Sequence, residues 1–288
     1  MPDFLHLTYD LNDPDITSVV DQVSLWAARF GFFLFSHLDL RPNLNILDVA
    51  CGTGFPLFEL AQMHGASCQV MGVDIWKQAV ERARLKANTY QCPNVQILEA
   101  DATQLPFADA TFDLIVSNLG VNNFPDPEAV LAECFRVARP GARLVLTTNP
   151  TGHMSEFYEV FRQTLRELQK PASLERLQAH EAHRGTKESL SDMLQAAGFR
   201  VVKIREDCFH LRYLDGSALF NHFLTQLGFL DGWRRVVDQE DEEGVFALLE
   251  DRLNQVARAA GELRMTVPML YLEGEKPDGE PLLPELVS

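Results

Sequence analysis

A glycine-containing loop carries the residues whose types and spacing are most specific for chemistry. Its sequence, DVACGTGF at residues 48–55, follows a short apolar run and precedes a helical pattern. Gly52 and Gly54 let the backbone approach a ligand closely, and the start of the following helix offers N–H groups without partners inside that helix. Asp74 ends the next apolar run, 20 residues after Gly54, a spacing at which a carboxylate can bind two ribose hydroxyls. Asp101 follows the third run, so the pattern predicts a site for a nucleoside-containing ligand.

The same loop distinguishes between cofactors. A dinucleotide site needs a third glycine at position 57, where the helix packs beneath the pyrophosphate, but the chain has Leu57. The carboxylate of Asp48 would repel a pyrophosphate and attract a cation, such as the ammonium group of an amino-acid-bearing cofactor. These two residues argue against NAD and for S-adenosylmethionine, which carries an ammonium and a sulfonium.

The elements that must position these residues alternate short apolar runs with helical patterns. Strands are predicted at 46–49, 69–73, 95–98, 112–116, 143–148, 199–204 and 265–272, and the main helices at 57–63, 78–87, 128–138, 154–169 and 189–197. The turn Arg139-Pro140-Gly141 is expected to precede the fifth strand. This alternation is typical of a parallel sheet with crossover helices. We therefore expect an α/β fold with a Rossmann-like, doubly wound, mostly parallel seven-stranded sheet, whose strand ends bring the candidate residues together.

Three segments lie outside this alternation. Residues 1–44 contain a helix or helix pair at 16–38 and are expected to form an N-terminal lid. Residues 45–275 would form the cofactor-binding domain, interrupted between its last two strands by a helical, aromatic cap at about 215–261, which is too long for a hairpin loop. Residues 276–288 are rich in proline and acidic residues, which predicts a disordered tail.

Composition limits the classes of partner. The chain has 288 residues and a formal net charge of −16, which disfavours nucleic acid and anionic membranes because both are bound mainly through Lys and Arg. It has no apolar run of the length that a membrane span needs. Its five cysteines form no C-x-x-C pair, and His180 and His183 lack a third ligand, so we expect neither a disulfide framework nor a metal site. A cytoplasmic protein is the simplest expectation.

Taken together, the motifs resemble those of the class I S-adenosylmethionine-dependent methyltransferases, in particular the small-molecule, quinone-biosynthesis-like branch (methyltransferase type 11). The resemblance is carried by residues 48–55, 73–74, 101–102, 112–117 and 139–141. It implies an enzyme that transfers a methyl group from S-adenosylmethionine, leaving S-adenosylhomocysteine, to a small, partly apolar molecule.

The resemblance also implies roles for individual residues. The methionine part would lie at the glycine loop, the ribose hydroxyls on Asp74, one adenine face on Ile75 and the adenine edge on Asp101 and the Ala102 N–H. Asn118 would lie beside the reacting methyl, and the N-terminal segment would cover the cofactor. The residues expected to contact the cofactor are Asp48, Ala50, Gly52, Gly54, Asp74, Ile75, Asp101, Ala102, Asn118, Tyr9 and Trp26.

Two departures from the family pattern bear on catalysis. Ala50 stands where the family often has its first glycine, and Asn122 and Asn123 stand where many relatives carry histidines. The Asn/Asp-Pro-Pro-aromatic signature of base and amide N-methylation is absent. Because no general base stands at that place, His153, shortly after the fifth strand, is the candidate base beside Asn118. The alternative is that His153 is a solvent-exposed loop residue.

Aromatic residues of the inserted segment are the candidates for an acceptor pocket. The expected pocket residues are Asn122, Tyr213, Phe220, His222 and Phe223. The same aromatic residues could equally pack the insertion onto the sheet, and His222 could stand at the core edge. Two other functions stay open at this point: an NAD-dependent oxidoreductase and a catalytically silent cofactor-binding subunit. The acceptor atom (oxygen, carbon or nitrogen), the use of a base, the pathway and the oligomeric state stay open as well.

Overall fold

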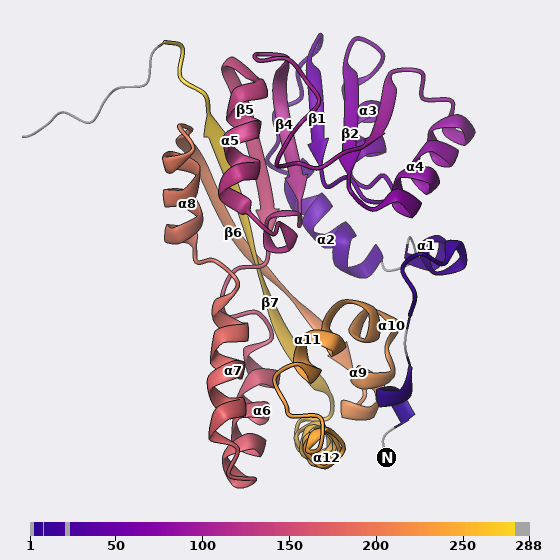
Figure 1. Ribbon diagram of the computed structural model, residues 1–288, viewed down its shortest axis with the longest axis vertical. Coiled ribbons are helices and arrows are strands. Elements are labelled where there is room, and N and C mark those ends of the chain that lie inside the picture. The colour runs from indigo at the N-terminus through magenta and orange to yellow at the C-terminus, as the bar shows by residue number, and fades with distance from the viewer. Residues whose placement is uncertain (1–2, 8, 21–23, 280–288) are drawn as a thin grey trace, which may run out of the picture. The chain divides into compact units, whose positions relative to one another are not determined.

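The structure, a computed structural model, describes residues 3–7, 9–20 and 24–279 (Figure 1). Within it the chain forms two compact units. Unit 1 takes residues 1–10, 149–185 and 207–269, and unit 2 takes residues 11–148, 186–206 and 270–288. The segment expected as a single lid, residues 1–44, is therefore divided between the two units after residue 10.

A seven-stranded sheet confirms the predicted fold class. Its strands are β1 (Asn45–Val49), β2 (Gln69–Asp74), β3 (Val95–Glu99), β4 (Phe112–Asn118), β5 (Ala138–Thr148), β6 (Arg200–Tyr213) and β7 (Leu263–Glu275). The strand order is β3-β2-β1-β4-β5-β7-β6. Strands β1 to β5 pair in parallel and β7 pairs antiparallel with β5. The short apolar runs of β1 and β4 are almost wholly buried, as expected for parallel strands covered on both faces.

Helices cover the strands of unit 2. They are α1 (Pro14–Val20), α2 (Ser24–Phe35), α3 (Leu57–His64), α4 (Lys77–Tyr90), α5 (Pro127–Val137) and α8 (Lys187–Ala196). The expected helix pair at 16–38 corresponds to α1 and α2, and residues 21–23 lie outside the described part. Side chains fix two helix starts, because Asp126 accepts from the Ala129 N–H (2.9 Å) and Thr186 forms a reciprocal capping box with Ser189. The latter cap explains why α8 begins two residues before the predicted start.

Strand β5 begins earlier than the sequence predicts. The structure places Arg139-Pro140-Gly141 inside β5, whereas a turn before the strand was expected. Ala138 pairs with Phe112, and the pairing resumes at Arg143 opposite Leu114 after a register irregularity. Gly141, at φ +75°, donates its N–H to the Lys276 carbonyl (2.8 Å). The segment is therefore an irregular part of the strand, held by backbone contacts from distant residues.

The chain stays ordered beyond the predicted start of the tail. Lys276 donates its N–H to the Ala142 carbonyl (2.9 Å), and its Nζ donates to the Phe135 and Ala138 carbonyls (2.7 and 2.9 Å). The predicted disorder is therefore wrong at Lys276, because this residue is tied to β5. Residues 280–288 of the predicted tail lie outside the described part.

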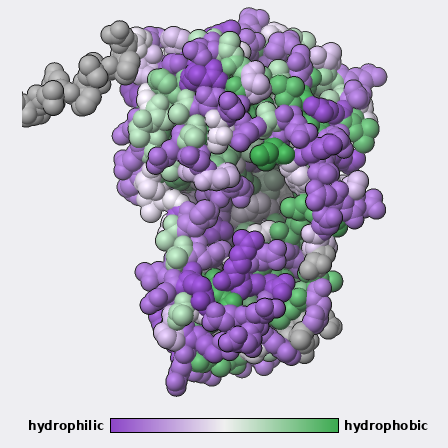
Figure 2. Space-filling view, in the orientation of Figure 1, coloured by the Kyte–Doolittle hydropathy of each residue, from purple (hydrophilic) through white to green (hydrophobic). Residues whose placement is uncertain are grey.

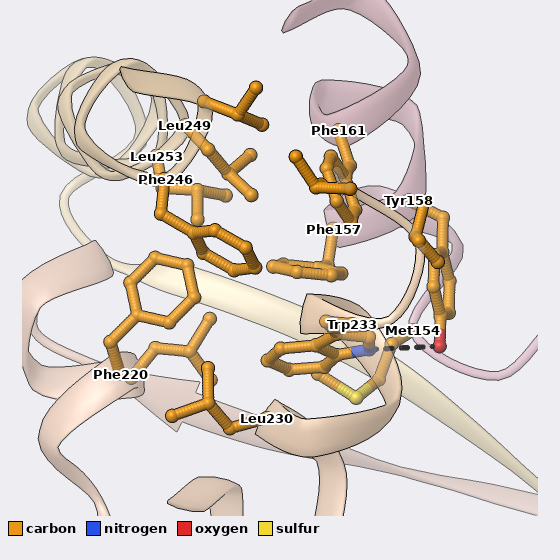
Figure 3. Close-up of a cluster of buried hydrophobic side chains, with 14 of the residues drawn as sticks. Met154, Phe157, Tyr158, Phe161, Phe220, Leu230, Trp233, Phe246, Leu249 and Leu253 are labelled. Atoms are coloured by element: carbon orange, nitrogen blue, oxygen red, sulfur yellow. Dashed lines mark hydrogen bonds between the residues drawn. The ribbon is translucent and has the colours of Figure 1, made fainter. Parts of the chain in front are cut away.

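Unit 1 is a mainly helical body with an aromatic core. Its elements are the 3₁₀ turn η1 (Asp3–His6), α6 (Ser155–Glu167), α7 (Pro171–Ala182), α9 (Gly216–Asn221), α10 (Phe223–Thr225), the π-helical turn η3 (Gln226–Leu230), α11 (Asp231–Arg234) and α12 (Glu242–Ala260). Trp233 stacks on Phe157 with ring centroids 4.1 Å apart, and its Nε1–H donates to the Tyr158 hydroxyl (3.1 Å; Figure 3). The residues 215–261 are helical as predicted, but they share this core with α6 and α7.

Part of the described surface of unit 1, over α11 and the segment that leads into α12, is strongly polar. Figure 2 shows hydrophilic side chains over α11 and the segment that leads into α12, where Asp231, Arg234, Arg235 and Glu242 lie. Among the described helices, none combines the length and the apolar character that crossing a membrane requires.

Candidate functional site

The candidate site lies at the carboxyl ends of three neighbouring strands of unit 2, β2, β1 and β4. β1 pairs in parallel with both β2 and β4, so the strand order reverses beside β1. In Figure 1 the arrows of β1, β2 and β4 point the same way. Asp48, Asp74 and Asn118 occupy the last or second-last positions of these three strands. The structure therefore brings them to one edge, at a switch point where open α/β sheets bind ligands.

Backbone contacts tie the glycine loop to β2. The Cys51 N–H donates to the Val73 carbonyl (3.0 Å), and the Gly52 N–H donates to Oδ2 of Asp74 (2.7 Å). Gly54, at φ +105°, could not carry a Cβ, which would lie 2.2 Å from the Phe58 ring of α3. A Cβ on Gly52, at φ +52°, would meet no atom within 4 Å. Gly54 thus allows close packing of α3, and Gly52 borders open space that a ligand can occupy.

Ala50, which stands where the family often has its first glycine, adopts a backbone conformation that glycine favours. Its φ is +62°, in the left-handed region that costs an L-residue about 1–2 kcal/mol. A Cβ on Gly120, after β4, would lie 3.1 Å from the Ala50 Cβ and 2.3 Å from Oγ of Ser117. The loops after β1 and β4 are therefore packed closely against each other, and this packing holds Ala50 in a strained conformation.

Asp48 is the most unusual group of the site. Its exposed fraction is 0%, and no described group makes a hydrogen bond of ordinary length and angle with either carboxylate oxygen. Burial, and then the charge of Asp74, raise the pKa of the Asp48 carboxyl well above its usual range; the nearby Leu57 N–H offsets only part of this. Because a buried carboxylate without a partner is costly, Asp48 fits a site that receives a cationic group such as an ammonium.

Two backbone N–H groups fix the orientation of the Asp74 carboxylate. Its Oδ2 accepts from the Gly52 N–H (2.7 Å) and its Oδ1 accepts from the Trp76 N–H (2.8 Å). Each carboxylate oxygen has capacity for a further hydrogen bond. The half-buried side chain is thus fixed in orientation and can still accept from a pair of hydroxyls.

Ile75 and Asp101 offer a ligand an apolar surface and a hydrogen-bond acceptor, respectively. Ile75 is a large apolar side chain, yet it is 71% exposed, which suits a planar base stacked on it. Asp101 is exposed, and its Oδ1 accepts from the Thr103 N–H and Oγ1 (both 2.8 Å), which lower the pKa of this carboxyl. Among the described residues these bonds leave Oδ2 for a ligand. Ala102 is half-buried next to it.

Asn118, the last residue of β4, is the candidate site residue on that strand. It is 8% exposed, and its Oδ1 accepts from Oγ1 of Thr147 on β5 (2.6 Å). The carbonyl side of the amide is thereby oriented, which leaves the amide N–H groups to donate elsewhere. Asn122 is half-buried in the 3₁₀ turn η2 (Val121–Asn123) of the same unit.

Sequence reasoning missed three residues that support these groups. Oγ of Ser117 donates to the Val49 carbonyl (2.8 Å), Thr147 orients Asn118, and Nζ of Lys86 on α4 donates to the Thr53 carbonyl in the glycine loop (3.0 Å). Ser117 and Thr147 were detectable as polar residues inside apolar strands. Lys86 gave no such signal, because it lies 33 residues from its partner on a polar helix.

The expected lid residues fall in different units. Tyr9 belongs to unit 1, where its hydroxyl donates to Oε1 of Gln226 (2.6 Å) and its ring meets Phe223 edge-on (5.2 Å between centroids). Trp26, on α2, belongs to unit 2 and packs against Phe30 (5.2 Å). Each therefore has a packing role within its own unit, and contact with the cofactor stays a prediction for both.

His153 does not have the environment expected for either of its roles. It is 2% exposed, so the expectation of a solvent-exposed loop histidine is wrong. Burial, and then the charges of Arg184 and His180, hold the pKa of the His153 imidazole well below its usual range. Its ring packs against Phe229 in unit 1 (5.4 Å between centroids). A weakly basic, buried imidazole is poorly suited to proton transfer, and we assign His153 to the interior of unit 1.

The aromatic residues proposed for an acceptor pocket divide into buried and accessible groups. Phe220 is 0% exposed and stacks on Phe4 (4.4 Å), so it packs the core of unit 1 and does not line a pocket there. Tyr213 and Phe223 are half-buried. His222 is exposed; its Nδ1 caps α10 by accepting from the Leu224 N–H (3.2 Å), which corrects the expectation of a core-edge residue.

Comparisons with known proteins agree with this geometry. A family model described as a methyltransferase domain matches residues 40–198. A demethylmenaquinone methyltransferase of Lactococcus lactis is 31% identical over 220 residues, which cover 71% of this chain and 81% of that protein. One of Geobacillus is 34% identical over 130 residues, covering 44% of this chain and 56% of that protein.

Solved structures share the fold. The YcgJ protein of Bacillus subtilis has a TM-score of 0.58 at 18% identity, with 88% of this chain and 100% of that chain covered. A SAM-dependent methyltransferase of Aquifex aeolicus has a TM-score of 0.52 at 23% identity, with 67% and 91% covered. Together with the glycine loop, Asp48 and Asp74, the family match shows that the chain belongs to the class I S-adenosylmethionine-dependent methyltransferases.

Proposed function

We propose that this enzyme methylates a small, partly apolar ring compound of the quinol type, using the candidate site to hold S-adenosylmethionine. The single observation that carries the cofactor assignment is Asp48, a fully buried carboxylate that no described residue neutralises. A pyrophosphate would be repelled there, whereas the ammonium of an amino acid would be attracted. The NAD-dependent alternative is therefore not supported.

We assign the parts of the cofactor to side chains by their chemistry. Asp48 would bind the ammonium group, and Asp74, already oriented by two backbone N–H groups, would accept from the ribose hydroxyls. Ile75 would cover one face of the adenine, and Oδ2 of Asp101 with the Ala102 N–H would bind its edge. Gly52 borders the space in which the methionine part would lie.

The bound cofactor supplies an electrophilic methyl group on a sulfonium. The task of this chain is then to align the acceptor and to exclude water, and such positioning can lower a barrier by about 7–11 kcal/mol. Asn118, oriented by Thr147, is placed to hold the acceptor side of this arrangement. We do not invoke a general base, because His153 is buried with a lowered pKa.

The proposed acceptor follows from the relatives and from charge. The curated relatives described above are demethylmenaquinone methyltransferases. A carbon of a quinol ring is electron-rich enough to attack the methyl group, and the proton on that carbon is then lost to water as the ring regains its aromaticity. The net charge of −16 disfavours nucleic acid as acceptor. A cytoplasmic location, a lid formed by residues 1–44 and a cap formed by residues 215–261 stay predictions.

An acceptor panel tests the proposal. Purified protein is incubated with S-adenosylmethionine and, in turn, a demethylated naphthoquinone held reduced under anaerobic conditions, the same compound oxidised, a catechol and an RNA mixture. We expect S-adenosylhomocysteine and a methylated product with the reduced quinone and not with the oxidised one or RNA. The Asp48→Ala variant should form both products much more slowly at a subsaturating concentration of S-adenosylmethionine. Turnover with RNA alone, or with no member of a broad panel, would contradict the acceptor assignment.

A further inference from the structure

A second group of polar side chains converges in unit 1, apart from the residues assigned to the cofactor. His180 lies in the last turn of α7, Arg184 lies two residues beyond the end of that helix, Tyr158 lies on α6, and His153 lies in the segment before α6. That segment is fixed to the residues that follow α7, because the Thr151 N–H donates to the Gly185 carbonyl (3.0 Å) and the Thr151 hydroxyl donates to the Arg184 carbonyl (2.5 Å).

Aromatic and glycine contacts enclose this group. The Tyr158 and His180 rings lie 6.0 Å apart between centroids, and Tyr158 is 1% exposed. A Cβ on Gly232 would lie 2.9 Å from Cε1 of His180, so the α11 backbone passes directly over this imidazole. Phe229 packs between His153 (5.4 Å) and Trp233 (5.8 Å). The group is therefore held inside a rigid aromatic frame.

Arg184 is half-buried and brings a positive charge to this group. Nε of Arg184 is buried, and no described group accepts a hydrogen bond from it. The nearest acid along the helix, Glu181, is bound by Arg162 through both carboxylate oxygens (2.5 and 2.7 Å). A guanidinium does not lose its proton in proteins, so its charge persists at every accessible pH.

The electrostatic surroundings of the two imidazoles agree with this distribution of charge. Burial, and then Arg184, His183 and Arg235, lower the pKa of His180 to about 4, and burial, Arg184 and His180 lower the pKa of His153. Among the described residues, the groups that shift these two imidazoles are arginines and other histidines, and no acid appears among the named causes. Glu181 acts on Tyr158 in the same cluster but is already paired with Arg162.

We propose that Arg184, His180, His153 and Tyr158 form a binding site in unit 1 for an oxyanion, either the carboxylate of an organic ligand or a tetrahedral oxyanion. Arg184 supplies the planar fork of donors that carboxylates and phosphate-like groups prefer. Tyr158 supplies a hydroxyl whose oxygen already accepts from Trp233, so its proton is available to donate. A bound anion would favour the charged imidazoles, and binding would therefore take up protons.

Binding of two probes tests the proposal. Isothermal calorimetry with inorganic sulfate and with benzoate is done at matched ionic strength in sodium chloride, and histidine titrations are followed by NMR with and without sulfate. We expect saturable binding of at least one probe and a higher pKa of His180 with sulfate. Because sulfate keeps its charge between pH 5 and 8, its affinity should rise several-fold from pH 7.5 to 5.5. Preference for benzoate points to an organic acid, and preference for sulfate to a tetrahedral oxyanion.

Matched variants locate the site. Arg184→Gln should weaken binding by at least about tenfold, because it removes the guanidinium fork and its charge while leaving a polar side chain. Arg166→Gln, at an exposed position on α6, removes the same charge and should leave binding unchanged. Equal binding by wild type and both variants would overturn the proposal. An unchanged His180 pKa in sulfate would overturn it too, even if Arg184→Gln failed to fold.

Discussion

Replacement of Asp48 by asparagine should make the protein more stable and less able to bind its cofactor. The carboxylate is 0% exposed, and no described group makes a hydrogen bond of ordinary length and angle with it. A buried polar group in this state costs about 1–3 kcal/mol or more when charged, so Asp48→Asn should raise the free energy of unfolding by about 1–3 kcal/mol at pH 8.

The pH dependence of this effect has a definite sign. The pKa of Asp48 in the folded protein lies well above the ordinary value of 3.8, because of burial and the charge of Asp74. The folded protein therefore binds a proton where the unfolded chain does not, and stability falls as pH rises through the folded-state pKa. The stabilisation by Asp48→Asn should vanish below pH 3.8, where both states are protonated.

Cofactor affinity should change in the opposite direction. Loss of one charge-assisted hydrogen bond of about 1.5–3 kcal/mol corresponds to about 10- to 150-fold weaker binding of S-adenosylmethionine. Urea denaturation between pH 5 and 8 and calorimetric titration measure the two effects. Asp192→Asn, at an exposed position on α8, controls for the change in net charge. A less stable Asp48→Asn protein, or one that binds the cofactor as wild type does, would refute the reasoning.

Three other features of the structure predict whether a substitution raises or lowers the free energy of unfolding. Ala50→Gly should add up to about 1 kcal/mol to the free energy of unfolding in urea, because glycine adopts φ +62° without strain, and a loss would contradict this. Trp233→Phe should cost about 1–3 kcal/mol in thermal unfolding, since the buried Tyr158 hydroxyl loses its donor; a change within about 0.5 kcal/mol would not fit. Burial lowers the pKa of His180 from 6.5 to about 4, so stability should fall as pH drops through this window, and His180→Asn should flatten that fall.

The cofactor edge of the sheet was predictable because its information is local. Asp48, Gly52 and Asp74 each stand at a fixed distance from an apolar run, and parallel pairing of those runs brings them to one edge. Ile75 directly follows Asp74 in the sequence, so its position at this edge was predictable in the same way, and the structure shows that it is exposed.

Residues whose surroundings come from distant parts of the chain were not predictable. His153 was expected to be a solvent-exposed loop residue, but it is 2% exposed and its ring packs against Phe229. From the sequence, Phe220 suited a pocket and a core equally well. The structure places it in the core, where it stacks on Phe4 from the first residues of the chain. Lys276 was predicted to begin a disordered tail. Its hydrogen bonds to the Phe135 and Ala138 carbonyls involve residues far away in the sequence, so the local sequence does not indicate them.

Thermal unfolding of the purified protein with excess S-adenosylmethionine, S-adenosylhomocysteine or NADH tests the central claim most directly. A ligand at 100 times its dissociation constant adds about 2.7 kcal/mol to the stability of the folded state. The first two ligands should raise the unfolding temperature of the wild type and leave that of Asp74→Ala unchanged, and NADH should have no effect on either protein. No shift with the two adenosyl compounds, or a shift with NADH alone, would contradict the assignment of Asp48 and Asp74 to this cofactor.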